Sequence, residues 1–130
     1  MVDDVEISYD EALERAILLI RSKWAASVLL TLAGGSHHVM DLLREINDNR
    51  VQRRERLSYK VMNDTLKSLV DAGLISKHRE TVGFATRSWC ELTPHGRALL
   101  QASRPLVAWY HIYSAARIAG DPGGDQPATA

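Results

Sequence analysis

This 130-residue sequence has a single cysteine and no long apolar run. Its only cysteine is Cys90, so a disulfide within the chain is excluded, which suits a reducing compartment. No apolar run reaches the roughly 20 residues needed to cross a bilayer. The first residues are acidic and lack the basic start of a signal peptide. We therefore expect a cytoplasmic protein without a membrane partner.

Sites for metals and for catalysis are also missing from the sequence. There is no C-x-x-C pair, and none of the metal-capable residues has the paired spacing of a zinc site. A nucleophile elbow, a glycine loop that cradles phosphate and paired carboxylates for acid–base chemistry are absent as well. The sequence therefore predicts no metal, no cofactor and no catalytic residue. The metal-capable side chains are His37, His38, His95, His111 and Cys90.

The formal net charge is zero, but the charges are unevenly distributed along the chain. Six acidic and no basic residues occur among the first 14, so the remainder carries a net charge of +6. Residues 50–67 hold six basic and two acidic residues, a local excess of +4. Because a polyanion responds to the distribution of charge rather than to its sum, neutrality does not exclude a nucleic-acid partner.

The first half of the chain has the periodicity of short helices. Ser8, with Glu11 three residues later, has the pattern of a capping box, and apolar residues then recur at helical spacing up to Ile20. Residues 23–33 are apolar nearly all round, which predicts a helix buried on most sides, and Gly34-Gly35 ends it. Met40 to Ile46 form a brief third helix. Residues 47–57 are polar and without periodicity, and are expected to be a surface loop.

The second half combines a helix, a hairpin and a long helix. Ser58 caps a helix over residues 59–72, and Gly73 ends it. Residues 74–81 and 87–92 alternate like two strands joined around Gly83. Thr93-Pro94 begins a last helix, which meets Pro105 and resumes beyond it. Cys90 follows Trp89 in a strand, so one of the two packs inward, which favours a buried structural thiol over a sensor.

The order of these elements predicts the fold class. It is mainly α with a small β-hairpin, the winged helix-turn-helix arrangement in which the last helix before the hairpin enters the major groove. A composition of 45% hydrophobic and 25% charged residues fits one globular domain, which we expect to span residues 1–119. Residues 120–130 lack large apolar side chains and are expected to be a disordered tail.

The helix over residues 59–72 has an apolar stripe that can anchor it and a polar stripe that can contact DNA. Asparagine can bond to an adenine edge, and lysine to guanine or phosphate. The helix start offers free amides to phosphate. On this polar stripe Asp64 is tolerated near DNA only if it bonds to cytosine or pairs with a lysine. The alternative interpretation is that the polar stripe is only the solvated face of the helix. The predicted DNA contacts on this helix are Ser58, Lys60, Asn63 and Lys67.

Arginines flank this helix on both sides. Those in the preceding loop either reach phosphates, dock a protein partner or only keep the loop solvated, whereas those in the hairpin lie where a wing touches DNA. The predicted contacts in the loop are Arg50, Arg53, Arg54 and Arg56, and those in the wing are Arg79 and Arg87.

Several motifs, taken together, resemble the HxlR-type regulators within the broader MarR-like winged-helix group. They are Lys23-Trp24, Gly34-Gly35, Leu66-x-x-Leu69-x-x-Ala72-Gly73-Leu74-Ile75 and Leu92-Thr93-Pro94-x-Gly96-Arg97-x-Leu99. The resemblance covers residues 16–110 and implies a homodimer, built from the N- and C-terminal helices, that binds a palindromic operator. Matched by position, it also implies that Tyr59 belongs with the DNA contacts of the recognition helix. The sequence departs from the family's pattern in two ways. The loop over residues 47–57 is longer, and no cysteine lies near the N-terminus, so a thiol switch there is not supported.

The last helix carries an apolar cluster, which is either core or, as we favour, a dimer interface, because aromatic residues are enriched at interfaces. An aromatic effector is conceivable there, but the sequence shows no pocket. The leading hypothesis is a sequence-specific transcriptional regulator that binds double-stranded DNA. The alternative is a winged-helix module that binds another regulator instead. The cluster consists of Leu106, Trp109, Tyr110 and Tyr113.

Overall fold

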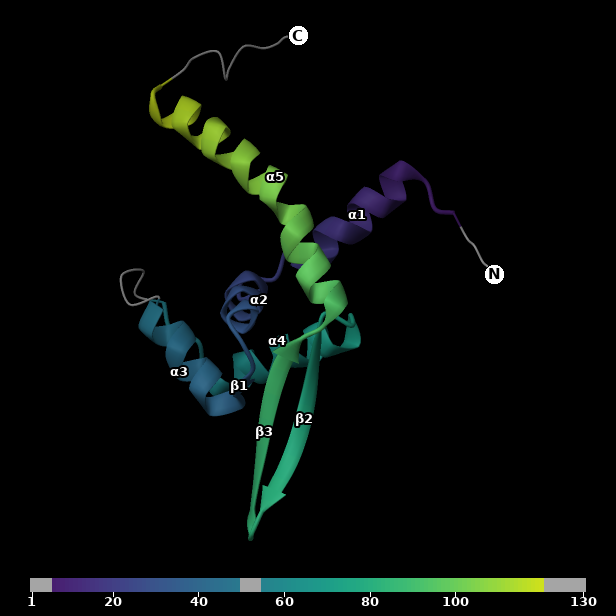
Figure 1. Ribbon diagram of the computed structural model, residues 1–130. Coiled ribbons are helices and arrows are strands. Elements are labelled where there is room, and N and C mark those ends of the chain that lie inside the picture. The colour runs from purple at the N-terminus through teal and green to yellow at the C-terminus, as the bar shows by residue number, and fades with distance from the viewer. Residues whose placement is uncertain (1–5, 50–54, 121–130) are drawn as a thin grey trace. The chain divides into compact units, whose positions relative to one another are not determined.

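The computed structural model describes residues 6–49 and 55–120. Contacts divide the chain into two units, one that ends at Arg97 and one that begins at Ala98. The mainly helical fold with a winged hairpin that the sequence predicts is confirmed (Figure 1). The elements are α1 (Tyr9–Ile20), α2 (Ala25–Ala33), β1 (His37–His38), α3 (Val39–Asn49), α4 (Tyr59–Asp71), β2 (Ile75–Val82), β3 (Ala85–Leu92) and α5 (Pro94–Ile118).

The core of the first unit is formed by α2, α3, α4 and the base of the sheet. Val28, Leu42, Met62 and Cys90 are each 0% exposed and come from four different elements. The expectation that the helix after Lys23 is buried on most sides is only half right. It begins two residues later, at Ala25, and its outer face leaves Leu30 63% exposed. Apolar composition alone therefore overstates how much of this helix is covered.

Helix α1 begins where its cap predicts, because the Ser8 side chain accepts a hydrogen bond of 3.1 Å from the Glu11 backbone amide. The carboxylate of Glu11 pairs with Arg15 one turn later, so the second bond expected of a capping box is replaced by an ion pair. No residue of α1 is buried. Helix α1 is thus capped at its start but has no buried face.

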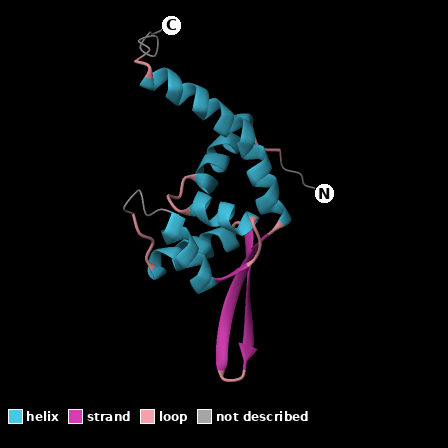
Figure 2. Ribbon diagram, turned by 60° about the vertical axis from the view of Figure 1, so that its left-hand side comes forward, coloured by secondary structure: helices cyan, strands magenta, loops and turns pink. Residues whose placement is uncertain are grey.

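The sheet has three strands in the order β1-β3-β2, one more than the predicted hairpin. His37 and His38, which the sequence suggested only as a link, form β1 and pair antiparallel with Cys90 and Trp89 of β3. Two residues are too few to show an alternating pattern, so the strand has no sequence signal. The hairpin of β2 and β3 turns at Gly83, which has φ +66°, and extends away from the helices (Figure 2).

The expected loop before α4 is shorter than predicted, because α3 continues to Asn49. The Asn47 amide, on this last turn, is buried. It donates to the Leu57 carbonyl at 3.1 Å and accepts from the Leu57 amide at 2.7 Å. The polar run 47–49 suggested solvent exposure, whereas Asn47 faces inward to join the two ends of the connection.

The start of α5 explains why threonine and glycine occur after the hairpin. The Thr93 hydroxyl donates to the Gly73 carbonyl at 2.7 Å and accepts from the Gly96 amide at 3.1 Å, which caps the helix. Gly96 is buried, and a Cβ there would lie 2.2 Å from the Leu74 carbonyl oxygen. Only glycine allows the helix to approach the backbone before β2 this closely.

The second unit consists of the rest of α5, which the sequence expected to break at Pro105. The helix instead continues through this proline without interruption, from Pro94 to Ile118. Residues 121–130 lie outside the described residues, so the disordered tail stays a prediction, as does the single domain over residues 1–119.

Candidate nucleic-acid interface

Helix α4 is fixed by its inner face, which leaves the outer face free to bind. Ser58 is an N-cap in extended conformation, and its hydroxyl accepts from the Val61 amide at 3.1 Å. Met62, Leu66 and Leu69 are buried, whereas Lys60 and Lys67 on the other side are exposed. The helix and its cap therefore lie where the sequence placed them, and so do the two lysines, whereas Val70 of the predicted apolar stripe is exposed.

Each lysine of the outer face is paired with an acid one turn later. The Lys60 ammonium lies 3.1 Å from the Asp64 carboxylate, and that of Lys67 lies 3.3 Å from Asp71. All four side chains are well exposed, and such pairs contribute only about 0.3–0.5 kcal/mol. The pairs can thus open at little cost when phosphate approaches. Of the two roles considered for Asp64, the structure shows the one that braces a lysine.

Asn63 is less available than the sequence suggests. The residue is half-buried, and its Oδ1 atom is buried without a hydrogen-bond partner among the described residues. A two-point bond to an adenine edge needs both the oxygen and the nitrogen of the amide. In this rotamer the oxygen cannot take part, so the predicted contact requires the side chain to turn.

Tyr59 and Arg87, far apart in sequence, line one cavity of about 230 Å³ on the first unit. Met40 and Asp41 bring the first turn of α3 to the same cavity, and β3 adds hydroxyl groups beside Arg87. Residues of β1, α3, α4 and β3 therefore converge here, with a cation, hydroxyl groups and the start of α3. The sequence placed Tyr59 and Arg87 near DNA but did not predict that α3 joins them. The other lining residues are His38, Val39, Thr86 and Ser88.

The two predicted wing arginines lie on opposite faces of the hairpin. Arg79 is opposite Ser88, and Arg87 is opposite Glu80, and neighbouring residues along a strand alternate between faces. Both side chains are exposed. Phe84, at the tip of the hairpin, is fully exposed, and the sequence analysis did not single it out. A lone aromatic residue in a turn has no periodic signal that would reveal it.

Only part of the arginine-rich loop can be placed. Arg56 is exposed just before α4, whereas Arg50, Arg53 and Arg54 lie outside the described residues. Glu55 forms an ion pair of 2.9 Å with Lys23, which ties the end of the loop to the start of α2. The roles assigned to the four arginines therefore stay predictions.

Cys90 is buried, as expected for a structural thiol. Burial raises the pKa of its thiol, and the nearby Lys77 charge only partly offsets this effect. The neutral thiol is a poor nucleophile, so this residue lacks the lowered pKa of a reactive cysteine. Among residues 6–49 and 55–120, no three His, Cys, Asp or Glu side chains group as metal ligands would.

Within the same described ranges, no single helix is long and apolar enough to span a membrane. Helices α1 and α2 reach that length and composition only together, across a bend of 78°.

The four residues predicted at a dimer interface form an exposed cluster on α5 in the second unit. The rings of Trp109 and Tyr113 are stacked with centroids 5.0 Å apart, and Tyr110 is tilted against both. Leu106 is 51% exposed, and Trp109 is 55% exposed. An apolar cluster of this kind is the composition expected of an interface rather than of a solvated helix.

Comparisons with known proteins agree with this geometry. Residues 19–117 match the HxlR-like helix-turn-helix family. A search of curated proteins found no match. The match to the HxlR-like family covers more than half of the chain, so it shows the family and confirms the resemblance seen in the motifs.

Solved structures show the same fold. A structure described as a MarR-family transcriptional regulator from Enterococcus faecalis is 24% identical, with a TM-score of 0.68, over 91% of this chain and 99% of that one. Another, from Porphyromonas gingivalis, is 22% identical, with a TM-score of 0.63, over 82% and 97%. The reduced form of the regulator YodB from B. subtilis is 18% identical, with a TM-score of 0.63, over 80% and 91%.

At these identities the solved structures show the fold alone, and the family match shows the class of protein. A capped helix with a polar outer face, a hairpin wing beside it and this match together lead to one conclusion: the chain belongs to the HxlR-like helix-turn-helix family of DNA-binding transcriptional regulators.

Proposed function

We propose that this chain binds a palindromic operator as a homodimer, with α4 of each protomer in the major groove. The observation that carries the proposal is the outer face of α4, where Lys60 and Lys67 are exposed and only loosely paired. Phosphates can replace Asp64 and Asp71 as partners of these lysines, because exposed pairs contribute little. In such a dimer the two α4 helices meet successive major grooves, about 34 Å apart.

Phosphate contacts at the start of α4 and on the wing would fix the position of α4 in the groove. Ser58 and the first amides of α4 form a helix start, which favours an anion. The cavity lined by Tyr59 and Arg87 offers a guanidinium, a phenol and hydroxyl groups to the neighbouring phosphate, and the Asp41 carboxylate that also lines it is paired with Arg44 at 2.9 Å. In this arrangement the wing and the start of α4 add phosphate contacts to those of Lys60 and Lys67.

The experiment begins with selection of bound sites from a random DNA pool, which yields the operator. Operator affinity is then measured by fluorescence anisotropy over a series of salt concentrations. We expect the double variant Lys60→Gln/Lys67→Gln to bind more weakly, with a salt slope smaller by about two per protomer, because two phosphate contacts are lost. Far-UV circular dichroism checks that the variant is folded.

The matched control is Arg15→Gln/Arg97→Gln, which removes the same charge from exposed positions away from α4. It should keep the salt slope of the parent protein. If both double variants weaken binding equally, net charge rather than α4 is responsible. If the lysine variant binds its operator normally, the assignment of α4 is wrong.

A homodimer is supported by apolar surface on two helices. Leu13 and Ile17 of α1 are each about half exposed, and none of the α1 residues is buried. The exposed cluster around Trp109 on α5 has the aromatic composition of an interface. A second copy of the chain, offering the same two surfaces, would cover both.

A second candidate is a module that binds another regulator instead of DNA. The pairing of both α4 lysines with acids favours it, because the net charge of this face is then zero, like that of the chain. Filter binding on random DNA at low salt separates the two functions. A DNA-binding regulator retains such DNA through phosphate contacts, whereas an adaptor retains almost none.

A further inference from the structure

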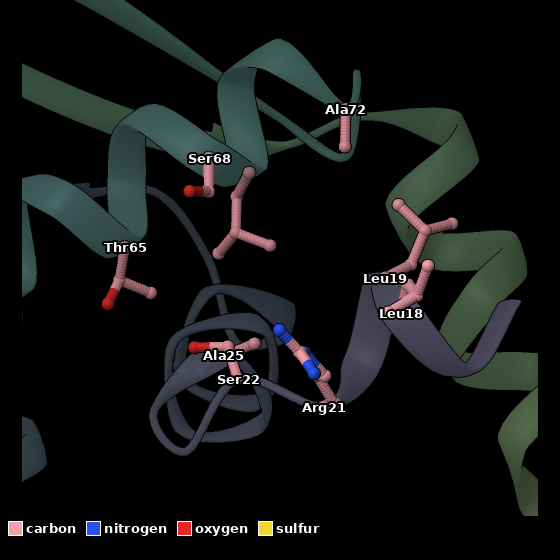
Figure 3. A pocket seen from close by; sticks show the side chains of 9 residues that line it. Leu18, Leu19, Arg21, Ser22, Ala25, Thr65, Ser68 and Ala72 are labelled. Carbon is pink, nitrogen blue, oxygen red and sulfur yellow. The ribbon is translucent and has the colours of Figure 1, made fainter. Parts of the chain in front are cut away.

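Two apolar surfaces of the first unit differ in what can cover them. Leu18 and Leu19, at the end of α1, lie beside a groove that α2 and α4 complete (Figure 3). They belong to the helix that we assign to the dimer, so a second copy of the chain can cover them. Val82 and Phe84 lie instead at the tip of the hairpin, where they are 63% and 109% exposed. The surfaces that we assign to the dimer do not include this tip.

The tip is held at the end of a stiff hairpin. Strands β2 and β3 are paired up to Val82 and Ala85, so the turn between them consists of Gly83 and Phe84 alone. A turn of two residues leaves the chain little freedom, and Gly83 takes its positive φ of +66° without steric cost. Phe84 is therefore presented at a defined position, and little further conformational entropy is lost when its ring is bound.

The chemistry of the tip differs from that of the rest of the wing. Residues 81–86 carry no charged side chain, so the tip cannot form an ion pair with phosphate. The Phe84 ring has no polar atom, and it gains free energy on binding only through burial and through contact with other rings. Stacked bases offer both, because every base has an apolar face on which an aromatic side chain can stack.

The position of Arg87 gives the distance from the tip to the proposed DNA contacts. Arg87 lines the same cavity as Tyr59 at the start of α4, where we propose that it contacts phosphate. A strand rises about 3.3 Å per residue, so Phe84, three residues away, lies roughly 10 Å beyond Arg87. The minor groove is only about 6 Å wide and 7.5 Å deep. A ring this far past a phosphate contact can therefore reach the floor of the neighbouring minor groove.

We propose that Phe84 is a wedge that enters the minor groove of the operator and inserts between two base pairs. An apolar side chain that inserts in this way unstacks the two pairs and bends the duplex by about 20–90°. Pyrimidine–purine steps unstack at the least cost, so the insertion should occur at such a step in each half-site. The inference rests on the proposed DNA-binding function and adds to it an apolar contact and a bent operator.

The bend is measured by circular permutation of the selected operator, because gel mobility depends on where in the fragment a bend lies. The parent protein should bend its operator by at least about 20°. Phe84→Ala should remove most of this bend and weaken binding about tenfold, because the burial of the ring is lost. Phe84→Leu, which is still an apolar wedge, should keep most of the bend. Because the Phe84 side chain is fully exposed, these variants should fold like the parent protein, which circular dichroism checks.

The salt dependence of operator binding separates a wedge from a phosphate contact. Phe84→Ala should keep the salt slope of the parent protein, because it removes no cation. Phe84→Lys should lose the bend and raise the salt slope by about one per protomer, because it adds a phosphate contact. The control Leu30→Ala, at a 63% exposed position of α2, should leave the bend, the affinity and the slope unchanged.

Three results would overturn the wedge. The first is an operator that the parent protein binds without bending, which leaves the DNA-binding function standing. The second is a bend of the same size with Phe84→Ala as with the parent protein. The third is self-association without DNA, measured by sedimentation velocity, that Phe84→Ala reduces, since a second copy of the chain would then cover the ring. A protein that retains no random DNA at low salt would overturn the DNA-binding function and the wedge together.

Discussion

The Asn47 side chain shows how one residue can decide the length of a connection. Its amide satisfies both the amide and the carbonyl of Leu57, ten residues away and equally buried. A buried backbone group without a partner is costly, so this pair holds the end of α3 against the start of the segment that leads into α4. The residue therefore joins the last turn of α3 to the segment just before α4.

Replacing Asn47 by alanine should lower the free energy of unfolding by about 1–3 kcal/mol, because both polar groups of Leu57 lose their partner. Urea unfolding of the full chain measures the change. The control Asn49→Ala, at an exposed position two residues later, should change stability by less than about 0.5 kcal/mol. Equal effects at the two positions would show that helix propensity rather than the bond to Leu57 is responsible.

Other single residues differ in how far their sequence context reveals them. Ser58 is recognisable as a cap because its contact is local, with the Val61 amide three residues away. The alternation of its strand predicts that either Trp89 or Cys90 packs inward, and the structure shows that Cys90 is the buried one. The buried oxygen of Asn63 does not follow from any local pattern, because helical spacing places this residue only at the edge of the polar stripe.

Among the elements, the hairpin wing has two faces, and only one of them carries an arginine that lines the cavity at the start of α4. Arg87 lines the cavity that also contains Tyr59 at the start of α4, and Arg79 lies on the opposite face. We therefore expect Arg87 to contact phosphate beside the recognition helix. The sequence alone treats the two arginines as equivalent.

Arg87→Gln should weaken operator binding several-fold and reduce the salt slope by about one per protomer. Arg79→Gln, which removes the same charge from the other face, should have a clearly smaller effect. Anisotropy titrations over a salt series measure both variants on the selected operator. The reverse order of the two effects would mean that the wing presents its other face to DNA.

The elements that the sequence identifies well are those with several turns or several alternating residues. Helix α4 has several turns and the hairpin has two alternating strands, and the ends of each carry cap or turn residues. Strand β1 has two residues, and its pairing with β3 depends on a partner more than 50 positions away. The break expected at Pro105 is also wrong, because proline removes only one donor and the rest of α5 continues the helix.

At the scale of the whole molecule, the exposed apolar surfaces of α1 and α5 bear on assembly. Ile17→Glu and Trp109→Glu, made separately, should each raise the dimer dissociation constant roughly a hundredfold, because a charge would be buried in the interface. Sedimentation velocity over a range of protein concentrations measures this. Leu30→Glu, at a 63% exposed position of α2, is the control and should leave the dimer intact. Unchanged sedimentation of both interface variants would contradict the proposed dimer.

The sequence by itself determined the fold class, the capped helix before the hairpin and the family, because helix caps, apolar stripes and the Leu-Thr-Pro-x-Gly motif are local features. Only the tertiary structure decided that Gly96 lies against the Leu74 carbonyl and that Tyr59 and Arg87 share a cavity. The physical reason is distance along the chain. Periodicity records which face of an element is buried, but not which remote residue lies opposite it.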